Sequence, residues 1–125
     1  MPIQVRITVK ELSLKAELFD TLCAQAIADI LPLEATINEW GDEFYFGIDL
    51  EMPLDETATT EVKIGDIGYW PPGKSMAIFF GPTPMSTGSD PVPASDVNIV
   101  GRIIDDATLL REAQSAEEIR ISIEH

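Results

Sequence analysis

The segment from Gly68 to Ser75 has the residue types and spacing of a phosphate-binding loop, because it fits the pattern G-x-x-x-x-G-K-S. Such a loop holds phosphate with successive backbone N–H groups and opens a helix whose positive end faces the anion. Here Pro71 and Pro72 lack that N–H donor, and a short apolar run typical of a strand follows Ser75. We therefore interpret the match as accidental and expect no nucleotide site.

Other residue types that carry out chemistry are sparse. Ser75 stands in a segment that departs from the nucleophile-elbow pattern at Ala77, and the single histidine is His125, at the end of the sequence. Cys23 is the single cysteine and falls on the apolar face of a predicted helix, which indicates a small buried hydrophobe. Zinc would need more soft ligands than these. We expect no catalytic residue, no metal site and no cofactor.

The charge of the chain excludes several classes of partner. Acidic residues number 22 against 8 basic ones, the net charge is −14, and the lysines and arginines are scattered. Phosphate backbones and anionic lipid headgroups need clustered Lys and Arg, so we expect neither nucleic acid nor a membrane surface as partner. The sequence starts without an apolar signal core and has no cysteine pair, which predicts a cytoplasmic protein with a solvated acidic surface.

Length and hydrophobic patterning predict one domain over residues 1–125. A chain of 125 residues that is 45% hydrophobic can bury one core. Alternating apolar residues predict a hairpin over residues 3–18 and another over 33–50, the second with its turn at Gly41-Asp42. Between them, a helix is expected from Asp20, as N-cap, to Leu31. Its predicted buried residues are Leu22, Ala26, Ile27, Ile30 and Leu31.

The second half of the chain continues the β pattern. Short strands are expected over residues 61–64, 67–70, 76–80, 97–104 and 119–123, with a short helix over 107–113. About eight strands without a βαβ rhythm predict a mainly β fold, either a barrel or a sandwich, with one or two short helices.

The aromatic and proline-rich stretch from Tyr69 to Pro84 raises a packing question. Alternation along a strand sends Phe79 and Phe80 to opposite faces, so the two rings cannot enter the same core. One face of that strand must therefore be covered by the helix, by a loop or by a ligand. The proline-rich loop from Thr83 to Asp96 is long for a connection in a compact domain, which is typical of functional loops.

Three segments together resemble a known family. They are Tyr69–Gly73, Ile78–Pro84 and Val97–Ile103, with weaker matches at Asp20-Thr21, Leu31-Pro32 and Trp40–Glu43. The chain is similar to the cyclophilin-like domain family of unknown function from bacteria and archaea. This resemblance implies a closed antiparallel eight-stranded cyclophilin-like β-barrel.

The resemblance also bears on activity. Cyclophilin isomerases use an arginine and a histidine beside an aromatic groove, but Val97 stands at the histidine's place and the arginine segment has no counterpart. A non-catalytic binding module is therefore expected, with a weak or altered peptidyl-prolyl isomerase as the alternative. A third possibility follows from the related barrel of the allophanate hydrolase and 5-oxoprolinase accessory proteins, by analogy of fold alone. It predicts a small amide-bearing ligand.

The expected ligand is a peptide or a small apolar molecule held in a surface groove. Prolines on both sides of the strand with Phe79 and Phe80 stiffen the backbone, which suits a preformed groove. The loop after Thr83 should cover the groove, with Thr83 as the hydrogen-bonding side chain and Met85 as an apolar wall. The predicted lining residues are Trp70, Phe80, Pro82, Thr83, Met85 and Val97.

Overall fold

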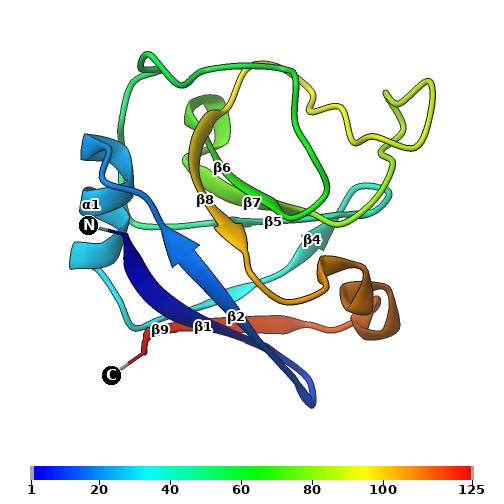
Figure 1. The fold of residues 1–125 in the computed structure, drawn as a ribbon, viewed down its shortest axis with the longest axis horizontal. Helices are drawn as coiled ribbons and strands as arrows, with labels where there is room; N and C mark the ends of the chain where they lie inside the picture. Colours follow the sequence, from blue (N-terminus) through cyan, green and yellow to red (C-terminus); the bar gives the residue numbers. More distant parts are fainter. Residues whose placement is uncertain (1, 125) are drawn as a thin grey trace.

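The computed structural model describes residues 2–124, which form one antiparallel sheet of nine strands (Figure 1). The spatial order of the strands is β3-β9-β1-β2-β8-β6-β7-β5-β4. Their bounds are β1 Ile3–Val9, β2 Leu12–Leu18, β3 Leu33–Thr36, β4 Asn38–Glu39, β5 Glu43–Gly47, β6 Asp66–Trp70, β7 Ser75–Phe79, β8 Asn98–Ile103 and β9 Glu118–Ile123.

The sheet curls into a nearly closed barrel because its two edge strands are consecutive in the chain. β3 pairs with β9, whereas β4 pairs with β5 at the other end of the strand order. Ile37 lies between them with its side chain buried, and its backbone N–H donates to the Glu117 carbonyl at 2.9 Å. The chain therefore changes partner at this one residue, which brings the two sheet edges together.

The change of pairing partner at Ile37 explains why the observed strands within residues 33–50 differ from the predicted hairpin. The hairpin predicted over residues 33–50 is confirmed only for β4 and β5, because residues 33–36 turn away to pair with β9. The expected strand over 61–64 is not formed, and those residues are irregular. The first hairpin, the strands within 66–79 and 98–103, and the closing strand are confirmed.

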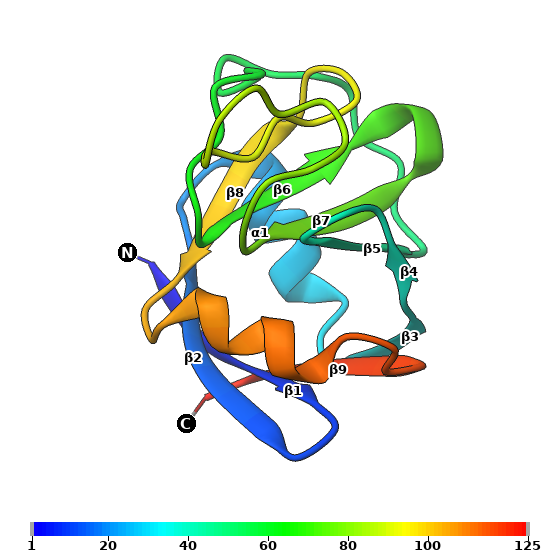
Figure 2. The ribbon, with the colours of Figure 1, turned by 90° about the vertical axis from the view of Figure 1, so that its right-hand side faces the viewer.

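Helices lie at opposite ends of the barrel (Figures 1 and 2). At one end is α1 (Leu22–Asp29), and at the other is the 3₁₀ helix η2 (Ala107–Ala113); a shorter 3₁₀ turn, η1 (Pro71–Gly73), joins β6 to β7. The phosphate-loop-like sequence therefore lies in the hairpin of β6 and β7, and no long helix follows it. Among the described residues, no helix is long and apolar enough to cross a membrane.

The N-terminal end of α1 differs from the prediction by one residue. Thr21, not Asp20, is the N-cap, and its hydroxyl accepts from the Ala24 N–H at 3.1 Å. The predicted buried face is wrong at Leu22, which is 79% exposed, while Ile27 is fully buried as predicted. The residues of α1 that face the core are Cys23, Ala24, Ile27 and Ala28.

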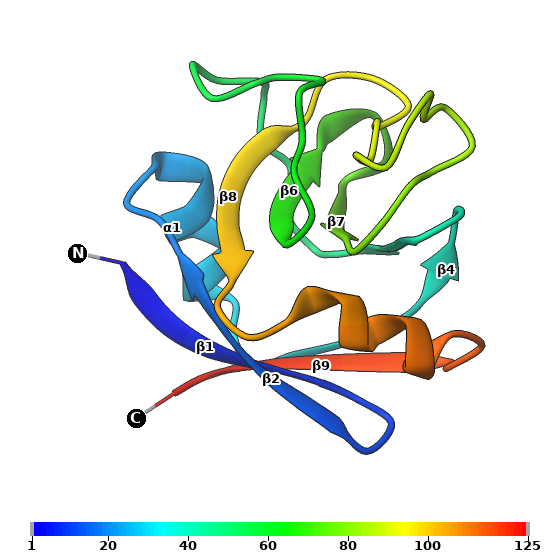
Figure 3. The same ribbon diagram turned by 45° about the vertical axis from the view of Figure 1, so that its right-hand side comes forward.

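The two faces of β5 and β7 pack against different groups. The inner face belongs to the main core, where the rings of Phe44 and Phe80 meet with centroids 4.7 Å apart. The outer face carries a second, smaller cluster of Val62, Ala77, Phe79 and Val97. Phe79 and Phe80 thus point to opposite faces, as alternation predicts, and both are fully buried. Figure 3 shows the loops that lie beside β6 and β7 on this outer side.

Candidate ligand-binding pocket

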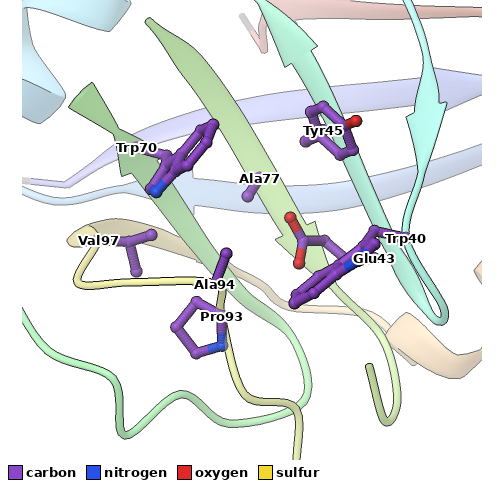
Figure 4. Close-up of a pocket in the computed structure, with 8 residues that line it drawn as sticks. All are labelled: Trp40, Glu43, Tyr45, Trp70, Ala77, Pro93, Ala94 and Val97. Atoms are coloured by element: carbon purple, nitrogen blue, oxygen red, sulfur yellow. The ribbon is translucent and has the colours of Figure 1, made fainter. Parts of the chain in front are cut away.

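A hollow lies on the outer face of β5, β7 and β6 (Figure 4). Because side chains alternate along a strand, Phe44 and Phe46 of β5 enter the core while Glu43 and Tyr45 point outward. The residues that line the hollow are Trp40, Glu43, Tyr45, Trp70, Ala77, Pro93, Ala94 and Val97.

Small residues in the middle of the sheet create this hollow. Across three strands the register places Tyr45, Ala77 and Gly68 side by side. Ala77 provides a shallow floor between the large side chains of its neighbours (Figure 4). At Gly68 the loop comes so close that an added Cβ would lie 3.0 Å from a Val97 methyl. Val97 therefore closes one side, and the space above Ala77 is left open.

Aromatic side chains form the walls. Trp70 is held by its indole N–H, which donates to the Ser95 hydroxyl at 2.7 Å. Trp40 and Tyr45 stand on the other side, and Pro93 and Ala94 complete the rim (Figure 4). The cavity measures about 240 Å³. A cavity of roughly 150 Å³ holds a benzene ring, so this one has room for a ring-sized group.

Glu43 is the polar residue that distinguishes this cavity. It is 7% exposed, and its Oε1 atom is buried without a hydrogen-bond partner among the described residues. Burial disfavours the charged carboxylate and raises the pKa of Glu43 to about 8. Figure 4 shows its carboxyl group between Trp40 and Ala77. The free protein therefore holds a largely neutral carboxylic acid in an apolar cavity at pH 7.

Side-chain hydrogen bonds fix the loops that surround the cavity. The Thr83 hydroxyl donates to the Val92 carbonyl and accepts from the Met85 N–H at 3.2 Å. Asn98, opposite Tyr69 of the main core, is fully buried on the inner side; its amide group donates to the Pro53 carbonyl at 2.9 Å and accepts from the Asp55 N–H at 2.8 Å. The bonds of Thr83 hold the loop over the outer face in place without a ligand.

The structure brings together only some of the predicted site residues. Trp70 and Val97 line the cavity. Phe80 does not, because its fully buried ring packs against Phe44 on the inner face. Thr83 is buried within the loop, where its hydroxyl is already engaged.

Two more predicted residues lie outside the lining. Pro82 is exposed, and Met85 is 53% exposed. The loop lies over the outer face and not beside Phe80, where the groove was predicted, and Pro93 and Ala94 line the cavity in place of the expected Met85. The apolar wall thus comes from the second half of the loop.

Sequence reasoning missed Glu43, Trp40 and Tyr45. Alternation along 43–46 already indicates that Glu43 and Tyr45 share the face opposite Phe44, and this signal was available. The sequence did not show that this face is buried, because its burial depends on the fold of the loop with Pro93 and Ala94, some fifty residues later in the chain. Among the described residues, no group of three or more His, Cys, Asp or Glu side chains is placed to hold a metal ion.

Comparison with known proteins places the chain in a family. A comparison with curated proteins finds no match. The hypothetical protein AF2241 from Archaeoglobus fulgidus, whose solution structure is known, is 34% identical; the alignment covers 98% of this chain and 95% of that one, with a TM-score of 0.80. McbB in complex with tryptophan shares the fold at 16% identity and a TM-score of 0.70; the match covers 95% of this chain but 44% of McbB. The family model described as cyclophilin-like matches residues 3–122, and the chain therefore belongs to the cyclophilin-like family.

Proposed function

We propose that this chain is a binding protein that holds a compact apolar group, from a small molecule or a peptide, in the cavity above Ala77. The observation that carries the proposal is the cavity itself: it is preformed, walled by three aromatic side chains, and has a buried carboxyl oxygen, Oε1 of Glu43, without a hydrogen-bond partner among the described residues. Apolar pockets with a few convergent polar groups are typical of ligand sites. Buried polar groups without partners are rare in folded proteins.

The size of the cavity limits the bound group. Pockets for drug-sized molecules span roughly 300–1,000 Å³, and this cavity, at about 240 Å³, is smaller. A single ring or one apolar side chain is therefore the expected occupant. Trp70 and Val97 would contact it, together with Trp40, Tyr45 and Ala77.

The alternative, a weak or altered prolyl isomerase, would use an arginine beside the prolyl amide. None of the residues lining the cavity is an arginine or a histidine, and the polar residue there, Glu43, is an acid. This composition favours binding over isomerisation. A protease-coupled assay on a Xaa-Pro peptide separates the two functions, since activity at the level of cyclophilin isomerases would overturn the binding proposal.

The binding proposal is tested by NMR titration of the ¹⁵N-labelled protein with benzyl alcohol and with indole. We expect saturable shifts at the amides of Tyr45, Ala77 and Val97. Ala77→Leu, which fills the cavity floor, should abolish the shifts. Met85→Ala is the matched control outside the lining and should leave them unchanged. Shifts elsewhere, or unchanged binding in Ala77→Leu, would contradict the proposal.

A further inference from the structure

Glu43 brings a carboxyl group into a cavity whose walls are aromatic. An apolar occupant alone would leave the buried Oε1 atom without a partner, at a cost on the order of a hydrogen bond. A donor on the occupant would remove that cost. A cationic donor would gain more, because charge-assisted hydrogen bonds are roughly twice as strong as neutral ones.

The three aromatic residues favour a cation for an independent reason. The faces of Trp and Tyr rings attract ammonium groups, and cages of such rings are the usual sites for organic ammonium ligands. Trp40, Tyr45 and Trp70 stand around the cavity, with the Glu43 carboxyl group among them (Figure 4). The net charge of −14 adds a general attraction for cations.

We propose that the occupant of the cavity is a small organic ammonium ion, whose N–H group pairs with the Glu43 carboxylate and whose apolar body packs among Trp40, Tyr45 and Trp70. This inference rests on the proposed function, because it requires that the cavity bind a ligand. It adds the chemical class of that ligand.

Binding of such an ion changes the protonation of Glu43. In the free protein at pH 7 the carboxyl group is mostly neutral, since its pKa is raised to about 8 by burial. An alkylammonium ion, with a pKa near that of lysine at about 10, is charged at the same pH. Pairing the two leaves an ammonium carboxylate pair in the cavity, and the proton of Glu43 passes to the buffer.

Other ionisable groups on the surrounding elements do not explain this behaviour. Asp42 precedes Glu43 and is paired with Arg111 of η2 at 3.0 Å, and Glu39 of β4 accepts from the Ser115 N–H at 2.7 Å. Across the sheet, β7 places Phe79 opposite Glu43, and the covering loop contributes Pro93 and Ala94. The pocket's own Tyr45 is the other titratable group. Burial is the cause that raises the pKa of Glu43.

The test compares benzylamine with benzyl alcohol, which have the same ring and differ in charge. Isothermal titration calorimetry at pH 7, in two buffers of different ionisation enthalpy, should show at least about tenfold tighter binding of benzylamine. It should also show release of close to one proton for each benzylamine bound. Between pH 6 and 7.5 the affinity for benzylamine should rise about tenfold per pH unit, while that for benzyl alcohol stays flat.

Glu43→Gln should remove both the proton release and the preference for benzylamine, and Glu112→Gln, an exposed acid, is the matched control. Because the pH profile is measured on the unaltered protein, the test does not depend on the folding of a variant. Equal, pH-independent binding of the two compounds would overturn the ammonium proposal and leave the binding function standing. Binding of neither compound at this cavity would overturn both.

Discussion

The inner and outer faces of β5 and β7 are both buried, yet they are built differently. The inner face is packed by side chains from the whole barrel, including α1, and Phe44 and Phe80 contact each other directly. Among the described residues, the buried apolar cluster of the outer face consists of Val62, Ala77, Phe79 and Val97, and a cavity of about 240 Å³ remains beside it. Strand alternation produces both faces from the same strands, but different elements cover the two faces.

The difference explains why the candidate site lies on the outer face. The inner face is covered by strands and a helix, whose buried side chains pack together in the main core. Loops cover the outer face; the loop after Thr83 is fixed by the polar bonds of that side chain and leaves the cavity beside Ala77 unfilled. The Glu43 acid is buried there with an unpartnered Oε1 atom, whereas the buried polar groups of Asn98 and Tyr69 on the inner side have hydrogen-bond partners. The inner face therefore carries most of the buried core, and the outer face has the space for the proposed ligand.

The largest expected effect comes from a charge placed on the inner side. Ile27→Asp would bury an unpaired carboxylate where α1 closes the barrel, and we expect the protein not to fold. Loss of the dispersed NMR spectrum measures this. Leu22→Asp is the control on the same helix, because Leu22 is 79% exposed, and it should fold normally. A folded Ile27→Asp protein would contradict the assignment of the core.

A large-to-small change on the inner face should be nearly as damaging. Phe80→Ala removes a fully buried ring that packs against Phe44, and we expect a loss of about 3–5 kcal/mol in the free energy of unfolding. Urea denaturation measures the loss. Met85→Ala, in the exposed part of the loop, should change stability by less than about 0.5 kcal/mol. A small effect of Phe80→Ala would return Phe80 to the candidate site residues.

Hydrophobic periodicity was enough to predict a barrel or a sandwich, and the family resemblance selected the barrel, but neither predicted the exact strand boundaries. The hairpins at residues 3–18 and 38–47 follow from local alternation and turn residues, and so does the separation of Phe79 from Phe80. The change of partner at Ile37 does not, because it depends on β9, some eighty residues away. Leu22 was wrongly assigned to the buried face of α1, because it lies five residues before Ile27 and therefore about 140° away around the helix.

The site was harder to predict than the fold. Trp70 and Val97 were found because they flank the conspicuous proline-rich segment. Glu43 was overlooked because an acidic residue at the start of a strand in so acidic a chain is usually exposed. Its burial depends on tertiary structure rather than on local pattern, because Glu43 lies in a cavity that it lines together with Pro93 and Ala94, and the bond from Trp70 to Ser95 ties this loop to the sheet.

The raised pKa of Glu43 makes the free energy of unfolding depend on pH. The folded state binds this proton more tightly than the unfolded state, where the pKa is about 4.5. Its contribution to stability is therefore complete below about pH 4.5 and is lost progressively as the pH rises to about 8. Within this window the free energy of unfolding should fall, relative to Glu43→Gln, by about 1.4 kcal/mol per pH unit.

Urea denaturation of both proteins at several pH values checks this prediction. Taking the difference between the two proteins cancels the titration of the other acidic residues. The free energy of unfolding of Glu112→Gln, which changes an exposed position, should vary with pH in parallel with that of the unaltered protein. Parallel curves for Glu43→Gln as well would show that the Glu43 carboxyl group titrates normally in the folded state.

The same substitution on the two faces should give the smallest but most direct contrast. Ala16→Leu adds volume to the filled inner core, where Ala16 is fully buried, and overpacking should cost about 1–3 kcal/mol. Ala77→Leu adds the same atoms above the cavity floor, where about 240 Å³ is free, so stability should be unchanged or raised. Urea denaturation of the pair measures the difference. An equal cost at both positions would mean that the outer face is as tightly packed as the inner one, and the cavity would then have no room for a ligand.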